Sequence, residues 1–455
     1  MDRSSEKLFS IPYEIAVVRP IRQTTRAERQ KALAAAYYNI ELLPQAMIYL
    51  DFKTDSGVSS LSTNQLVKLL SPHVLESGVE MAPEANKAFV HLTEAVQTIL
   101  GFPFIIPVSQ GRAAERIWTR IHVKQGSVIP GNMLFPSTRY HIDSNGGRAI
   151  DVVNESAYDL YSGDPFKGNI DLGKLESVLE EQGTNVPCVY VELCVNGCGG
   201  HPVSLANLKA VQSLCKARRI PVFLDGCRIL ENSYLIKTRE QGQDHRPIRD
   251  IVHDLASCAD GLTMSALKDF LVPAGGLIAT RDEASYQKAH FASFFGGDQA
   301  ASATMEAITA AMEEIFADDA YIESRVEQVS YLWSRLKAAV PVLQPAGGHA
   351  VYIDVKKFLP NLAPELNPAE ALAAFIYERS GIRVAKGPPA SSRQREKGVD
   401  LLRIAVPARR YLREQIDDAA NALIDAYCRR EEIAGLRKLD QPGRSRFAPS
   451  FYVPA

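Results

Sequence analysis

The 455-residue sequence lacks long apolar runs, a large net charge and any pattern of paired cysteines. No apolar run approaches the roughly 18 residues of a transmembrane helix, so we expect no membrane span. The formal net charge is −2, which gives no indication of binding to nucleic acid or to a membrane surface. Residues 1–7 are polar and no apolar segment follows them, so we expect no signal peptide.

The seven cysteines are an odd number and are scattered among apolar segments. This pattern favours reduced thiols and therefore a cytoplasmic protein. Cys194 and Cys198 are four residues apart, but no second pair follows at the spacing of a zinc site. The sequence therefore predicts no metal site.

Apolar strands alternate with helices in the first two thirds of the chain, as is typical of a parallel sheet in an α/β fold. The expected strands there are 49–52, 104–108, 128–135, 188–193, 220–225, 262–264 and 277–279. The expected helices are 26–38, 64–70, 84–100, one starting near Arg112, and 205–217.

The pattern changes after residue 300, where long helices outnumber strands and a smaller α+β domain is indicated. We expect helices at 300–316, 320–340, 369–379 and 416–437, strands at 350–355 and 401–407, and an aromatic-containing coil at 438–455. The expected division is an N-terminal arm with part of the small domain (1–50), a large domain (51–315) and a small domain (316–455).

Lys268 lies between two short strands, among small and apolar neighbours. Burial is expected to lower the pKa of a lysine, and a neutral amine is the nucleophile that forms a Schiff base with an aldehyde. An exposed lysine in a loop after a strand is an equally probable interpretation of this stretch taken alone.

A second chemical signal follows the apolar strand 220–225, which ends in Asp225, with Arg228 three residues later. Ligands in parallel α/β sheets gather at the carboxyl ends of strands. A lysine for an aldehyde, an aspartate for a ring nitrogen and an anion site for a phosphate together match pyridoxal phosphate.

Two further stretches offer groups for such a cofactor. Gln110, Gly111 and Arg112 form a small-residue turn between a strand and a helix, where free N–H groups and a guanidinium attract an anion. Phe135 is expected at a strand end, where its ring could lie on the cofactor ring. A plain strand–helix turn and a core phenylalanine are the alternatives.

Arg403 stands inside an apolar strand, where an unpaired guanidinium is costly. A substrate α-carboxylate would satisfy it in bidentate fashion. An internal ion pair with a carboxylate is the alternative.

These residues resemble the tryptophanase and tyrosine phenol-lyase family, the β-eliminating lyases of fold type I, over nearly the whole chain. The most specific segments are 54–57, 110–115, 199–210, 264–269, 347–350 and 401–403. The resemblance implies a large domain with a mostly parallel seven-stranded sheet, a smaller α+β domain, bound pyridoxal phosphate, an amino-acid substrate, and homodimers or homotetramers with shared active sites.

The resemblance also implies roles for individual residues. Lys268 would carry the cofactor as a Schiff base, with Asp225 at its ring nitrogen and Arg228 near its ring oxygen. The other implied cofactor contacts are Gln110, Gly111, Arg112 and Ser265 at the phosphate, Phe135 on the ring, and Asn196. The residues implied around the substrate carboxylate are Thr54, Ser56, Asn196 and Arg403.

The sequence departs from the family at the substrate's side-chain end. Pro83 and Met81 align with the family's tyrosine acid and with its cation-binding glutamate. Lys386 stands where tyrosine phenol-lyase has a substrate-facing arginine, so we expect it to bind the substrate side chain. The remaining departures are Leu267 for a lysine, Pro136 for a threonine, and Phe447, which matches tyrosine phenol-lyase and not tryptophanase.

Without a tyrosine acid, expulsion of indole or phenol would lose a factor of roughly 100 to 10,000 in rate. We therefore expect a lyase acting on another α-amino acid rather than a true tryptophanase or tyrosine phenol-lyase. An aminotransferase, a β-replacement or an aldolase-type enzyme on the same scaffold is the alternative, and a non-catalytic paralogue is a more distant one.

Overall fold

The computed structural model describes residues 11–14, 18–71, 86–440 and 449–455, and it divides into two compact units. The large unit is Ser56–Val326, and the small unit joins Met1–Asp55 to Glu327–Ala455. The limits expected for the large domain, residues 51 and 315, stay a prediction. No helix among the described residues is both long enough and apolar enough to cross a membrane.

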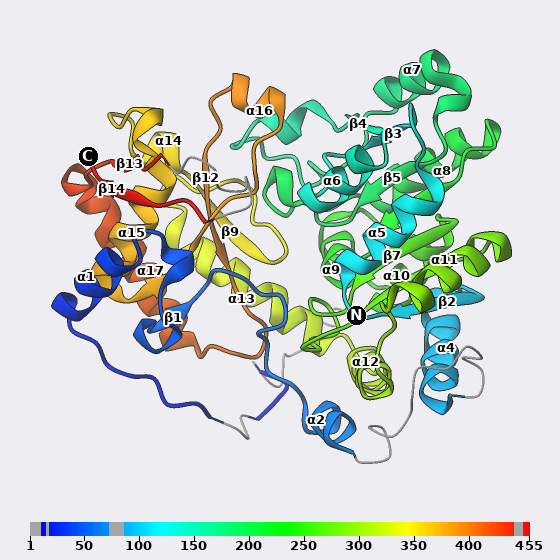
Figure 1. Cartoon of the computed structure of the whole chain (residues 1–455), viewed down its shortest axis with the longest axis horizontal. Helices are drawn as coiled ribbons and strands as arrows, with labels where there is room; N and C mark the ends of the chain where they lie inside the picture. The colour runs from blue at the N-terminus through cyan, green and yellow to red at the C-terminus, as the bar shows by residue number, and fades with distance from the viewer. Residues whose placement is uncertain (1–10, 15–17, 72–85, 441–448) are drawn as a thin grey trace, which may run out of the picture. The chain divides into compact units, whose positions relative to one another are not determined.

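A seven-stranded sheet forms the centre of the large unit, in the order β2-β8-β7-β6-β5-β3-β4 (Figure 1). Only β8 runs antiparallel to its neighbours, so the predicted mostly parallel sheet is confirmed. The strands are β2 (Phe104–Val108), β3 (Val128–Gly131), β4 (Arg148–Asp151), β5 (Val189–Glu192), β6 (Val222–Asp225), β7 (Gly261–Ser265) and β8 (Gly276–Thr280).

Helices follow most strands of this sheet, as the alternating pattern predicts. They are α2 (Thr63–Leu70), α4 (Lys87–Leu100), α5 (Gly111–His122), α6 (Pro136–Ser144), α7 (Leu172–Gln182), α8 (Leu205–Ala217), α9 (Ile229–Arg239), α10 (Ile248–Ser257), α11 (Glu283–Gly296) and α12 (Ser302–Ile315). The next helix, α13 (Ala320–Leu336), crosses the boundary between the units.

Helix α4 shows how local sequence sets these elements. The Asn86 side chain accepts a hydrogen bond from the backbone N–H of Ala88, which begins the helix. Leu92, Val96 and Ile99 recur at helical spacing and are buried. Gly101 ends the helix in the left-handed conformation, at φ 71°, which favours glycine.

Among the described residues of the small unit, the strands form three small sheets. One has the order β11 (Ala385–Lys386), β12 (Leu401–Ala405), β9 (Ala350–Asp354); the others pair β1 (Leu50–Asp51) with β10 (Ile382–Arg383) and β13 (Leu436–Lys438) with β14 (Tyr452–Pro454). The helices are α1 (Arg26–Ala35), α14 (Val355–Phe358), α15 (Pro368–Ser380), α16 (Ser392–Glu396) and α17 (Arg413–Cys428).

Four predictions need correction. The strand expected at 49–52 is β1, which pairs with β10 in the small unit, and the seven-stranded sheet instead includes β4, which was not predicted. The strand expected at 128–135 ends at Gly131, and Pro136 begins helix α6, because proline is favoured in a first helical turn. The helix expected to run to Arg437 ends at Cys428. The expected coil at the end of the chain includes strand β14, although its Phe451 does dock by stacking on Tyr37 at 4.5 Å between ring centroids.

A buried ion pair joins β1 to β10 in the small unit. Asp51 and Arg383 are register partners, and the guanidinium donates through Nη2 to Oδ2 at 2.6 Å and through Nε to Oδ1 at 3.1 Å. Both residues are buried. Loss of one partner would leave a buried charge uncompensated, which is far more costly than loss of an exposed pair.

We therefore expect Arg383→Met to lower the free energy of unfolding by about 3–5 kcal/mol. The matched control is Arg26→Met, which breaks the more exposed pair with Glu378 and should cost less than about 1 kcal/mol. Urea unfolding of both variants under one set of conditions measures the difference. Equal losses in the two variants would contradict the argument.

Candidate active site

Functional side chains of the large unit gather where β5, β6 and β7 end. Glu192 is the register partner of Asp225, and Asp225 is the register partner of Thr263, so the three strands end at one edge of the sheet. Lys268 follows β7 by three residues, in the segment that leads to β8. The carboxyl edge of a parallel sheet is where α/β proteins bind ligands.

Lys268 is half-buried at this edge, and its Nζ lies 5.5 Å from the centre of the Phe135 ring. The expectation that its pKa falls is wrong. Burial does lower the pKa of Lys268, but its electrostatic interactions with Cys227 and with the Asp225 carboxylate raise it, and the net pKa lies above the usual value of a lysine. The amine therefore keeps its proton beside the Asp225 carboxylate.

Asp225 ends β6 and is 5% exposed. Its Oδ1 accepts a hydrogen bond from the backbone N–H of Cys227 at 3.0 Å. This contact fixes the carboxylate at the turn between β6 and helix α9.

Arg228 immediately precedes helix α9 and is buried within the large unit. Its Nη1 lies 3.0 Å from Oε2 of Glu231, and Oε1 of Glu231 lies 3.2 Å from Nη2 of Arg325. Glu231 and Arg325 are not among the residues predicted from the sequence. This buried carboxylate between two guanidinium groups holds Arg228 in place.

Gln110, Gly111 and Ser265 pack together at the start of helix α5. Gln110 forms an isolated β-bridge with Gly275. A Cβ on Gly111 would lie 2.5 Å from the Ser265 Cβ, so only glycine fits at position 111. No side chain among the described residues caps the helix at Gln110, and Arg112 in its first turn is exposed. The first N–H groups of a helix have no intrahelical acceptor and can bind an anion.

Phe135 immediately precedes helix α6. The same helix carries Thr138, which contacts helix α5. The Thr138 hydroxyl donates to Oε1 of Glu115 at 3.2 Å. Burial and the nearby charge of Asp225 raise the pKa of Glu115 to about 7. Sequence reasoning treated Glu115 only as part of a motif and missed it as a titratable neighbour of the site.

Asn196 lies in the turn after β5 and is buried. Its backbone N–H and its Nδ2 both donate to Oε1 of Glu192, at 2.9 and 3.1 Å. Glu192 was also missed, although an acidic residue at the end of the fully buried strand Val189–Glu192 is a signal that the sequence does contain.

The predicted substrate-binding residues belong to both units. Ser56 is in the large unit, whereas Thr54, Arg403 and Lys386 are in the small unit. Arg403 Nη2 donates to the Lys53 carbonyl at 3.1 Å, and its buried Nε has no hydrogen-bond partner among the described residues.

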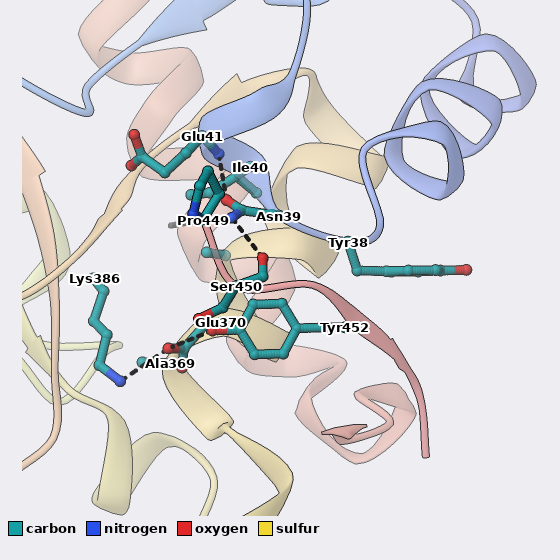
Figure 2. Close-up of a pocket in the computed structure, with 11 residues that line it drawn as sticks. Tyr38, Asn39, Ile40, Glu41, Ala369, Glu370, Lys386, Pro449, Ser450 and Tyr452 are labelled. Carbon is teal, nitrogen blue, oxygen red and sulfur yellow. Dashed lines mark hydrogen bonds and ion pairs between the residues drawn. The ribbon is translucent and has the colours of Figure 1, made fainter. Parts of the chain in front are cut away.

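Lys386 has a partner within the small unit. Its Nζ lies 2.9 Å from Oε1 of Glu370, which also accepts a hydrogen bond from the Tyr452 hydroxyl at 3.3 Å (Figure 2). The three side chains line a pocket of about 340 Å³. Met81, Pro83 and Phe447, on which the expected specificity depends, lie outside the described residues.

Comparison with known proteins identifies the family. The model of the β-eliminating lyase family matches residues 51–422. Tyrosine phenol-lyase of Symbiobacterium sp. (strain SC-1) is 38% identical over 465 residues, with 99% of each chain covered. Tyrosine phenol-lyase of Pasteurella multocida (strain Pm70) is 37% identical over 457 residues, covering 97% of this chain and 98% of that protein.

A solved structure agrees in fold. Serine palmitoyltransferase of Sphingomonas wittichii superposes with a TM-score of 0.63 at 12% identity, covering 90% of this chain and 97% of that chain. The likeness supports the predicted fold type I architecture. The family match and the full-length similarity establish that this chain belongs to the β-eliminating lyase family of pyridoxal phosphate-dependent lyases.

Proposed function

We propose that this protein binds pyridoxal phosphate through Lys268 and eliminates a side-chain group from an α-amino acid. The observation that carries the proposal is the placement of Lys268 beside Asp225 and Phe135, at the carboxyl edge of the sheet. When bound, the cofactor supplies an aldehyde and a ring that withdraws electrons from the substrate.

The residues present fit this cofactor. The start of helix α5 has no side-chain cap among the described residues, and Gly111 and Ser265 are in close contact there, which suits a phosphate group. We assign the phosphate to Gln110, Gly111, Arg112 and Ser265. The buried carboxylate of Asp225 suits a protonated ring nitrogen, and a positive charge there would weaken the attraction that keeps the proton on Lys268.

The chain's own residues then have distinct tasks. Phe135 would cover one face of the cofactor ring, and Arg228, which Glu231 holds in place, would bind near the ring oxygen. Lys268 would hold the cofactor through its Nζ, and its free amine would be the base that accepts the proton from the substrate Cα. Thr54, Ser56, Asn196 and Arg403 would bind the substrate carboxylate, since the Nε of Arg403 has no hydrogen-bond partner among the described residues.

The leaving group distinguishes two candidate functions. Pro83 has no proton to give and Met81 is a poor ligand for a hard cation, so we favour a substrate with a better leaving group, such as a thiolate, and a polar or anionic far end. Lys386 would contribute to its recognition, although its amine is already paired with Glu370. Tyrosine phenol-lyase activity is the second candidate, favoured by the names of the relatives.

Transamination, β-replacement and retro-aldol cleavage begin from the same complex and remain alternatives. We further propose a cytoplasmic homodimer or homotetramer that shares active sites between subunits. Light scattering together with activity assays at micromolar concentration tests the assembly.

The first prediction concerns Lys268. The purified protein should be yellow, with absorbance near ~420 nm, and borohydride should fix the cofactor to the peptide that contains Lys268. Lys268→Ala should abolish this label, whereas Lys209→Ala, which removes an exposed lysine, should retain it. Peptide mass spectrometry measures the label. A label on another lysine would refute the assignment.

The second prediction concerns Asp225. Asp225→Ala should lower kcat by at least about 100-fold even when the cofactor is retained, because an unprotonated ring nitrogen withdraws electrons poorly. The control is Asp244→Ala, which removes an exposed carboxylate. Turnover should be measured at equal cofactor occupancy, determined from absorbance. Near-normal turnover of the Asp225 variant would show that the residue has another role.

The third prediction concerns the leaving group. Release of phenol or indole should be slower than release of thiols from S-substituted cysteines by roughly 100- to 10,000-fold, the usual contribution of a general acid. Potassium should have little effect. Steady-state pyruvate formation across tyrosine, tryptophan, S-substituted cysteines and acidic amino acids measures this. Efficient phenol release with strong potassium activation would favour the second candidate function.

A further inference from the structure

The two carboxyl oxygens of Glu192 have different surroundings. Oε1 accepts two hydrogen bonds, from the backbone N–H of Asn196 at 2.9 Å and from its Nδ2 at 3.1 Å. Oε2 is buried and has no hydrogen-bond partner among the described residues. Only 2% of Glu192 is exposed, so solvent water cannot readily supply the missing hydrogen bond to Oε2.

Glu192 also faces a second carboxyl group. It is the register partner of Asp225 on the neighbouring parallel strand, so both side chains leave the sheet on the same face. Lys268 beyond β7 and Cys198 in the turn after β5 also interact with it electrostatically. Two buried carboxylates this close cannot both ionise easily.

The site of the remaining proton follows from the hydrogen bonds. Burial and the charge of Asp225 raise the pKa of Glu192 to about 8, so the group is mostly protonated at neutral pH. Because Oε1 already accepts two N–H groups, the proton belongs on Oε2. A buried O–H donor requires an acceptor, and none of the described residues provides one.

We propose that Glu192 is a further cofactor-binding residue, a carboxylic acid that holds Asn196 through Oε1 and donates the Oε2 proton to an oxygen of the bound cofactor. This inference rests on the proposed function, because it assumes a ligand at Lys268. Glutamine at this position would keep both contacts, since its oxygen can accept from Asn196 and its amide nitrogen can donate. Leucine would keep the volume and lose both contacts.

The ionisation of Glu192 should make the affinity for the cofactor depend on pH. Above pH 8 the donor is lost and a second negative charge stands beside Asp225, so the cofactor should bind more weakly there. Glutamine does not titrate and serves as the reference at each pH. Groups that do not interact with Glu192 titrate alike in both proteins, and their effect cancels in the ratio of the two dissociation constants.

The test uses cofactor-free full-length protein and measures the dissociation constant of pyridoxal phosphate between pH 6.5 and 9.5. The unaltered protein and Glu192→Gln should agree within about threefold at pH 6.5 and differ by about tenfold at pH 9.5, in favour of glutamine. Glu192→Leu should bind about tenfold more weakly than Glu192→Gln at every pH. Glu94→Gln, an exposed change on α4, should behave as the unaltered protein.

Two results would overturn the proposal: a ratio that stays constant with pH, or a leucine variant that binds as tightly as the glutamine variant. Thermal unfolding of each variant shows whether a loss of binding reflects a loss of folding. Borohydride labelling separates this inference from the proposed function. Labelling of Lys268 with a constant ratio would refute the role of Glu192 alone, whereas an unlabelled Lys268 would refute both.

Discussion

The attraction between Lys268 and the carboxylate of Asp225 is the interaction on which the candidate site depends. It places a positive amine among acidic groups at one sheet edge, where Asp225 and Lys268 also affect the protonation of Glu115 and of Glu192. Burial makes each of these charges costly alone, so their protonation states are linked. The parallel register of β5, β6 and β7 fixes which side chains meet, and the fold thereby sets the chemistry.

Local sequence was sufficient where an element carries its own signals. Helix α8 was predicted at its observed limits, because Ser204 caps its first turn and the apolar positions recur at helical spacing. The end of helix α17 was predicted nine residues too late, since charged residues after Cys428 continue good helix-forming composition. Strand β13 at Leu436 depends on pairing with β14, which local patterns do not reveal.

The same difference between local signals and contacts from distant parts of the chain applies to the candidate site. Asp225 and Lys268 could be found from sequence because they follow apolar strands, and ligand-binding groups gather at such ends. The direction of the Lys268 pKa could not, since it depends on acidic neighbours from other strands. Glu192 was missed for the same reason: its register with Asp225 and its contact with Asn196 exist only in the folded sheet. The cap-free start of α5, in contrast, was signalled by the Gly111 turn.

The small unit is built from two stretches of chain that are made at different times. Strand β1 pairs with β10, and Asp51 is 332 residues from its partner Arg383. At the usual speed of protein synthesis, roughly 5–20 residues per second, the first stretch waits on the order of tens of seconds for the second. During that interval Leu50 and Phe52, which end fully buried, have no core to enter. The N-terminal segment therefore exposes apolar side chains for as long as the ribosome needs to make the second stretch.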